Sequence, residues 1–121
     1  MGEALAIEVR DEQGYAIVAA VGEIDMSTVT GLRERLFELA VSGRPLVVDL
    51  EQVSFLDSSG LAALIGAAKR AAAHGGSVCA VCDRPKIRQL FELTGLDCRI
   101  PLARTLDEAL EALAAARTTP R

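Results

Sequence analysis

The sequence predicts a single α/β domain, built on a small mixed β-sheet with about four helices. Three observations favour this fold class. Two strand-like apolar segments come first, strand and helix patterns then alternate to the end of the chain, and 50% of the 121 residues are apolar. Consecutive strands indicate a hairpin, whereas strands that alternate with helices indicate parallel pairing through helical crossovers. A chain of this length can bury a core without disulfides or a metal.

The opening hairpin is predicted from the first 21 residues. Every second residue from 5 to 9 is a large aliphatic one, as in a strand with one buried face. Residues 11–14 have the polar and glycine chemistry of a turn. Residues 15–21 form a more continuously apolar strand, and residues 22–27 are predicted to be a polar loop.

A first helix is predicted to begin near Ser27, because aliphatic residues recur there at the spacing of one helical face. This stripe consists of Val29, Leu32, Leu36 and Leu39. Residues 42–43 end the helix, and Pro45 prevents its continuation. The apolar run 46–50 has the length of a strand, and residues 51–58 lead from it to the second helix.

The second helix has its own apolar stripe and closes at a pair of glycines. The stripe consists of Leu61, Leu64, Ile65 and Ala68. Residues 74–76 end this helix, and residues 77–82 form the next strand. Cys79 and Cys82 lie three positions apart on that strand and therefore point to opposite faces. We interpret them as small buried residues and not as metal ligands.

Two further helices complete the predicted order β-β-α-β-α-β-α-(β)-α. Pro85 suits the first position of the third helix. The inward face of that helix would consist of Ile87, Leu90 and Phe91. Gly95 is predicted to end it in the left-handed conformation, and residues 99–102 to be extended. Thr105 and Glu108 form a capping box at the start of the last helix. The buried face of the last helix would consist of Leu106, Leu110 and Leu113. Residues 118–121 are predicted to be a disordered tail.

Charge and composition argue against several functions. The net charge is -4, the pI is about 5.0 and the basic residues are scattered, so direct nucleic-acid binding is not expected. No apolar run approaches the roughly 20 residues of a membrane helix, and the N-terminus lacks the features of a signal peptide. The three cysteines are an odd number and make a poor disulfide framework. We therefore expect a cytoplasmic protein without a membrane partner.

The segment 55–61, Phe-Leu-Asp-Ser-Ser-Gly-Leu, lies between a predicted strand and a predicted helix. It places the hydroxyls of Ser58 and Ser59 at a helix N-terminus, where unpaired N–H groups and the positive end of the helix dipole accommodate an anion. A phosphate carried by Ser58 would be tolerated there. A plainer interpretation is that either serine is simply an N-cap, worth about 1 kcal/mol.

Other chemistries fit the sequence poorly. Neither serine lies in a G-x-S-x-G motif. The only histidine, His74, lies near the far end of the following helix, about 20 Å from the serines. Residues 22–25 lack the lysine and the glycine pattern of a nucleotide loop. The carboxylates near strand ends and helix starts are interpreted as caps and loop residues. We predict no catalytic residue, cofactor or metal.

Three segments together resemble the STAS-domain family of anti-sigma factor antagonists. Residues 22–25, Gly-Glu-Ile-Asp, are similar to the family's G-E-[IL]-D segment. Residues 48–61 resemble its phosphorylation segment, and residues 87–96 resemble its third-helix signature. The three segments follow the family's order and spacing over nearly the whole chain. The resemblance implies a STAS domain over residues 1–117, with helices packed mainly on one face of the sheet.

The resemblance also implies a partner-switching function. In that family the unmodified antagonist binds an anti-sigma factor that is also a serine kinase, and this binding releases the sigma factor. The kinase uses ATP to phosphorylate the antagonist, and a PPM-type serine phosphatase resets it. The family's acceptor is the serine directly after the Asp, which is Ser58 here. The other partner-binding residues that the resemblance implies are Asp25, Asp57, Ser59, Gly60 and Leu61.

The same fold leaves other functions open. STAS domains also occur as accessory subunits of lipid-transporting ABC systems, as cytoplasmic parts of anion transporters and as scaffolds in stress signalling. An anion-transporter part would be attached to membrane spans, which this sequence lacks. The Asp-Ser-Ser-Gly sequence at 57–60 favours the phosphorylatable antagonist. Small-molecule sensing or catalysis is a separate class, to which 3% aromatic residues and one histidine give little support.

Overall fold

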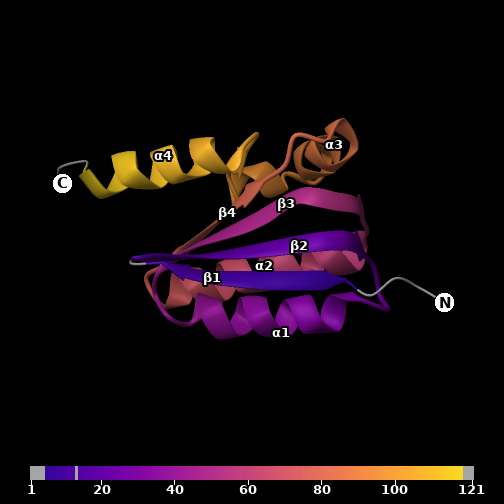
Figure 1. Cartoon of the computed structure of the whole chain (residues 1–121), viewed down its shortest axis with the longest axis horizontal. Helices are drawn as coiled ribbons and strands as arrows, with labels where there is room; N and C mark the ends of the chain where they lie inside the picture. The colour runs from indigo at the N-terminus through magenta and orange to yellow at the C-terminus, as the bar shows by residue number, and fades with distance from the viewer. Residues whose placement is uncertain (1–4, 13, 119–121) are drawn as a thin grey trace.

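The computed structural model describes residues 5–12 and 14–118, which contain a five-stranded sheet in the order β1-β2-β3-β4-β5 (Figure 1). The strands are β1 (Ala6–Glu12), β2 (Tyr15–Ile24), β3 (Pro45–Leu56), β4 (Ser77–Val81) and β5 (Leu102–Ala103). The helices are α1 (Val29–Ala40), α2 (Ser58–Ala73), α3 (Pro85–Thr94), the 3-10 helix η1 (Leu96–Cys98) and α4 (Leu106–Thr118). Because β1 and β2 are antiparallel and the other neighbours are parallel, the predicted hairpin and mixed sheet are confirmed.

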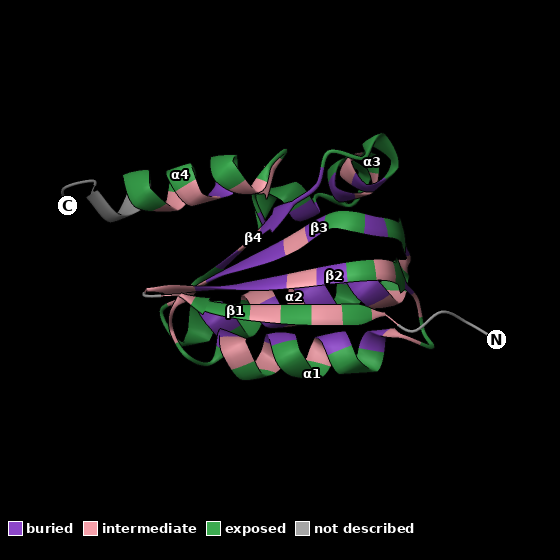
Figure 2. Cartoon of the chain, viewed as in Figure 1, coloured by how far each residue is buried: buried purple, intermediate pink, exposed green. Residues whose placement is uncertain are grey.

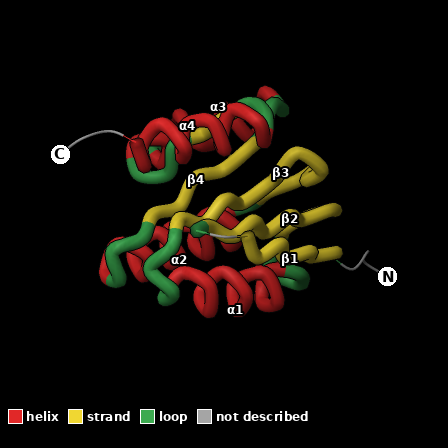
Figure 3. Tube along the Cα trace, turned by 60° about the vertical axis from the view of Figure 1, so that its left-hand side comes forward, coloured by secondary structure: helices red, strands yellow, loops and turns green. Residues whose placement is uncertain are grey.

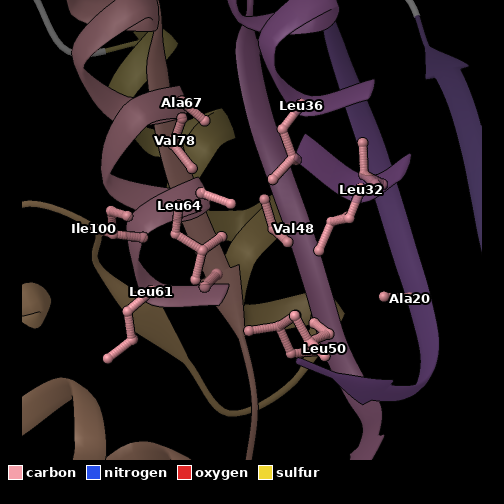
Figure 4. Packing of buried hydrophobic residues seen from close by; sticks show 14 of the residues in the cluster. Ala20, Leu32, Leu36, Val48, Leu50, Leu61, Leu64, Ala67, Val78 and Ile100 are labelled. Carbon is pink, nitrogen blue, oxygen red and sulfur yellow. The ribbon is translucent and has the colours of Figure 1, made fainter. Parts of the chain in front are cut away.

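Helices cover the two faces of the sheet unequally (Figures 1 and 3). α1 and α2 lie together on one face, where Leu36 and Leu64 pack with Val48 of β3 in the main core (Figure 4). The buried residues of α3, Ile87 and Phe91, belong to the same core. α4 lies on the other face, where a smaller cluster contains Ile17, Val47, Val81 and Ala109. Most of the apolar surface is therefore buried on the α1–α2 side.

β2 and β3 are longer than the sequence predicts. The sequence predicts a loop from residue 22 and a strand that ends at residue 50, whereas β2 continues to Ile24 and β3 to Leu56. The prediction is wrong because one face of each strand becomes exposed near its end, so the apolar run stops while the strand does not (Figure 2). Val53 and Leu56 stay buried, and two register shifts between β2 and β3 break the simple alternation.

The ends of the other elements follow the sequence more closely. α1 begins at Val29, two residues later than predicted, and Gly95 ends α3 at a φ of 73° as predicted. The capping box is confirmed in half: the Glu108 N–H donates to Thr105 Oγ1 at 3.1 Å, but Glu108 Oε1 accepts from Arg104 N. The sequence predicts one extended piece over residues 99–102, whereas residues 99–101 form a turn after η1 and only Leu102 and Ala103 form the short β5.

The cysteines and the chain end bear on the remaining sequence predictions. Cys82 is buried in the main core and Cys79 packs in the α4 cluster, so the two thiols lie on opposite faces as predicted. Burial raises the pKa of Cys79 to about 11, which keeps it a neutral thiol.

Thr118, predicted to open the tail, is the last residue of α4, and residues 119–121 lie outside the described residues. No helix in the described part of the chain is long and apolar enough to cross a membrane.

Candidate functional site

The candidate site forms where β2 and β3 end side by side. Ile24 pairs with Leu56 in the last position of the parallel ladder. One residue further, the Asp57 N–H donates to the carbonyl of Ile24 at 3.2 Å. The two loops that follow these strands are therefore neighbours, and the predicted site residues Asp25 and Ser58 come together although they are far apart in the sequence.

Asp57 is the N-cap of α2. Its Oδ1 accepts from the N–H of Ser59 at 2.9 Å and from the N–H of Gly60 at 3.3 Å. The hydroxyl of Ser59 donates to the same oxygen. The simple interpretation that Ser58 or Ser59 caps the helix is therefore wrong, because the carboxylate already occupies that role. The sequence predicts unpaired N–H groups in the first turn of α2. This prediction is wrong for Ser59 and Gly60, because Asp57 accepts from both N–H groups.

Ser58 and Ser59 differ in availability. Ser58 is the first residue of α2, is exposed, and its hydroxyl makes no hydrogen bond with any group that the structure describes. Ser59 is half-buried and its hydroxyl is engaged with Asp57. Of the two adjacent hydroxyls, only that of Ser58 is free to meet an incoming reagent.

Asp25 organises the neighbouring loop in the same way. Its Oδ1 accepts from the N–H and the hydroxyl of Ser27 at 2.9 and 2.7 Å, and from the N–H of Thr28 at 3.2 Å. The Thr28 hydroxyl donates to the carbonyl of Glu23 at 2.8 Å and closes the loop. Each loop thus has an Asp that bonds the serine two residues later. The residue between the Asp and the serine is Met26 in the first loop and Ser58 in the second.

The hydrogen bonds keep both carboxylates charged. The Ser59 hydroxyl lowers the pKa of Asp57 below its ordinary value, and the Ser27 hydroxyl does the same for Asp25. The negative charge of Asp25 acts on the pKa of Asp57 in the opposite direction, which reflects how close the two groups are. Ser58 therefore lies beside two carboxylates that are ionised at neutral pH.

Gly60 allows the N-terminus of α2 to approach the strand ends. It is buried, and a Cβ at this position would lie 2.3 Å from Leu56 Cδ1 and 2.8 Å from Ile24 Cγ2. Real Cβ atoms do not come this close to other heavy atoms. The predicted site residue Gly60 is thus explained by packing: a larger residue would push α2, and Ser58 with it, away from the Asp25 loop.

Substituting Gly60→Ala should destabilise the fold by about 1–2 kcal/mol, because overpacking outweighs the helix propensity gained. Gly31→Ala is the matched control, since Gly31 is likewise the third residue of its helix. Its nearest contact would be Ile7 Cδ1, at an ordinary 3.8 Å, so this change should stabilise by about 0.5–1 kcal/mol. Urea unfolding of both variants measures the two shifts. Midpoints that rise equally would contradict the packing role of Gly60.

The structure buries Leu61 and exposes two apolar residues near the site that the sequence did not predict as contact residues. Leu61, predicted as a contact residue, is only 8% exposed. Met26 is 82% exposed beside Asp25, and Phe55 is 48% exposed near the end of β3. The sequence carried a signal for Met26, because a large apolar residue stands there in a polar loop. It carried none for Phe55, whose strand was predicted to end earlier.

The described residues offer little for catalysis. None of their His, Cys, Asp and Glu side chains form a group that could hold a metal ion. His74 is exposed at the C-terminal end of α2, where its Nδ1 lies 2.9 Å from the carbonyl of Arg70. Because α2 has 16 residues and rises about 1.5 Å per residue, His74 lies more than 20 Å from Ser58. The arrangement presents a single hydroxyl to another molecule.

Comparisons with known proteins agree with this arrangement. A family profile described as the STAS domain matches residues 6–109. The chain is 34% identical over 90 residues to an anti-sigma-B factor antagonist of Bacillus subtilis, with 74% of this chain and 83% of the relative covered. It is also 34% identical over 102 residues to an anti-sigma F factor antagonist of Paenibacillus polymyxa, covering 81% and 86%. The crystal structure of an anti-sigma factor antagonist from Mycobacterium paratuberculosis superposes with a TM-score of 0.83 at 34% identity, covering 93% and 97%.

Proposed function

Since the chain belongs to the STAS-domain family, we propose that it is an anti-sigma factor antagonist controlled by phosphorylation of Ser58. The unmodified protein binds an anti-sigma factor that is also a serine kinase, and this binding releases the sigma factor. The kinase transfers the γ-phosphoryl group of ATP to Ser58, and a PPM-type phosphatase removes it. The protein acts in the cytoplasm as a binding partner and not as an enzyme, without a cofactor of its own or direct contact with nucleic acid.

One observation carries the proposal: the Ser58 hydroxyl is exposed and unbonded, whereas the hydroxyl of Ser59 is held by Asp57. A kinase must reach an oxygen that can attack the γ-phosphorus and lose its proton. Ser58 meets this requirement without any rearrangement of α2. The family's acceptor is the serine directly after the Asp, which is the same residue.

The surroundings of Ser58 make phosphorylation a sharp electrostatic change. A phosphate adds roughly 1.5 to 2 negative charges at pH 7. The N–H groups of Ser59 and Gly60 already donate to Asp57, so they are not available to the phosphate unless the cap opens. Asp25 and Asp57 add repulsion from two sides. The new charge is thus poorly compensated within the protein and would face the partner, while the capped helix keeps its fold.

Intact-mass spectrometry tests the proposal. The protein is incubated with ATP and each candidate serine-kinase anti-sigma factor of its organism, beside the variants Ser58→Ala and Ser59→Ala. We expect a gain of one phosphate on the wild type and on Ser59→Ala, and none on Ser58→Ala. A PPM-type phosphatase should then remove the phosphate. Absence of phosphorylation by every kinase, or a phosphate that persists in Ser58→Ala, would refute the proposal.

A further inference from the structure

A groove runs along α2 on the side that faces α3 and η1. It encloses about 300 Å³ next to the first turns of α2. Its walls include Leu61, Ile65, Lys69, Thr94, Leu96 and Arg99. A second hollow of about 330 Å³ shares Lys69 and Arg99 and is otherwise lined by alanines of α2. The two hollows therefore meet at the same pair of cations.

Lys69 and Arg99 are unpaired within the described chain. Both side chains are exposed. The ion pairs that the described residues form are Arg10 with Glu12, Arg44 with Asp11, and Arg104 with Asp83. Acidic residues on the neighbouring elements, Glu92 of α3 and Asp97 of η1, form no ion pair with either cation. The groove thus combines an apolar floor with two positive charges that no described carboxylate neutralises.

The Ser58 site at the start of α2 and the groove further along this helix carry opposite charges. Asp25 and Asp57 make the end around Ser58 negative, whereas Lys69 and Arg99 make the groove positive. Lys69 lies eleven residues after Ser58 on the same helix, which is a rise of about 16 Å along its axis. A protein kinase that binds at Ser58 is large enough to extend over this distance and reach the groove.

We propose that the groove binds an acidic side chain, Asp or Glu, on an apolar segment of the serine kinase that phosphorylates Ser58. The inference rests on the proposed function and names a second contact for the same partner. The carboxylate pairs with Lys69 and Arg99 while apolar neighbours cover the half-buried Ile65. Because the Ser58 site is negative and the groove is positive, the partner can dock with full charge complementarity in one orientation only. That orientation presents Ser58 to the kinase.

The double variant Lys69→Glu/Arg99→Glu tests this contact. Its affinity for the kinase that phosphorylates the wild-type protein should fall about tenfold or more at moderate ionic strength, because two attractive contacts become repulsive. The difference should narrow at high salt. Both positions are exposed, and circular dichroism checks that the fold is retained.

Arg33→Glu/Arg35→Glu is the matched control, with the same change of net charge on α1. We expect this control to bind within about twofold of the wild type, because its charges lie outside the groove. A kinase variant with the pairing Asp or Glu changed to Lys should bind Lys69→Glu/Arg99→Glu more tightly than the unchanged kinase does, and should bind the control more weakly.

Three outcomes would overturn the inference. The first is wild-type affinity of the groove variant for a kinase that binds and phosphorylates the wild type, which would leave the proposed function intact. The second is saturable binding of inorganic phosphate at Lys69 and Arg99 in an NMR titration, which would make the groove a small-anion site. The third is failure of the wild-type protein itself to bind any serine kinase, which would remove the proposed function as well.

Discussion

Ser58→Glu should weaken binding to the kinase by tens- to thousands-fold while leaving the fold intact. A partner surface shaped for a neutral hydroxyl would meet a buried, unpaired charge, and this costs roughly 2–5 kcal/mol of binding free energy. Asp25 and Asp57 stay ionised beside the new carboxylate, and the first-turn N–H groups are already occupied by Asp57. Isothermal titration calorimetry with the kinase identified by the phosphorylation assay measures the loss.

A charge elsewhere on the surface provides the control for this substitution. Ser77→Glu adds the same charge at the exposed start of β4, which lies at the opposite end of the sheet from the loop that follows β3. Its affinity should stay within about twofold of the wild type, since exposed distant charges are largely screened. Equal weakening by both variants would show that net charge and not the position of Ser58 controls binding. Unchanged affinity of Ser58→Glu would contradict the prediction that a negative charge at position 58 prevents the kinase from binding.

Phe91→Ala should cost about 3–5 kcal/mol of folding stability, a large part of the total for a domain of this size. Phe91 is fully buried and is the largest of the fully buried side chains. It anchors α3 to the main core, and truncation leaves a cavity that the surrounding side chains fill only partly. Chemical unfolding gives the change directly, as a lower denaturant midpoint.

The same helix contains the control for Phe91→Ala. Leu93 lies two residues further on α3 and is 77% exposed, so Leu93→Ala should change stability by no more than about 0.5 kcal/mol. If the two variants were equally stable, α3 would not be held by Phe91.

If Phe91→Ala folds, its weakened α3 should also lower the affinity for the kinase, because α3 and η1 form one wall of the proposed docking groove.

Local sequence patterns predicted much of the architecture because they act within a few residues. The apolar stripe of α1, the proline that opens α3 and the left-handed Gly95 are each determined by their own segment. Strand ends were predicted less well. The outer halves of β2 and β3 have one exposed face, so their pattern ceases to be apolar although pairing with the neighbouring strand continues.

By itself the sequence determined the fold class, the order of elements and the family, and the family resemblance predicts Ser58 as the acceptor. Only the tertiary structure decided which serine is free, because that depends on the Asp57 cap. It also brought Asp25 beside Ser58 and explained Gly60, since both depend on strands that pair across more than 30 residues of sequence. Lys69 and Arg99 line the same groove only in the tertiary structure, because α2 and the segment around η1 pack together although they are far apart in the sequence. Contacts between distant segments arise from packing, which no local pattern records.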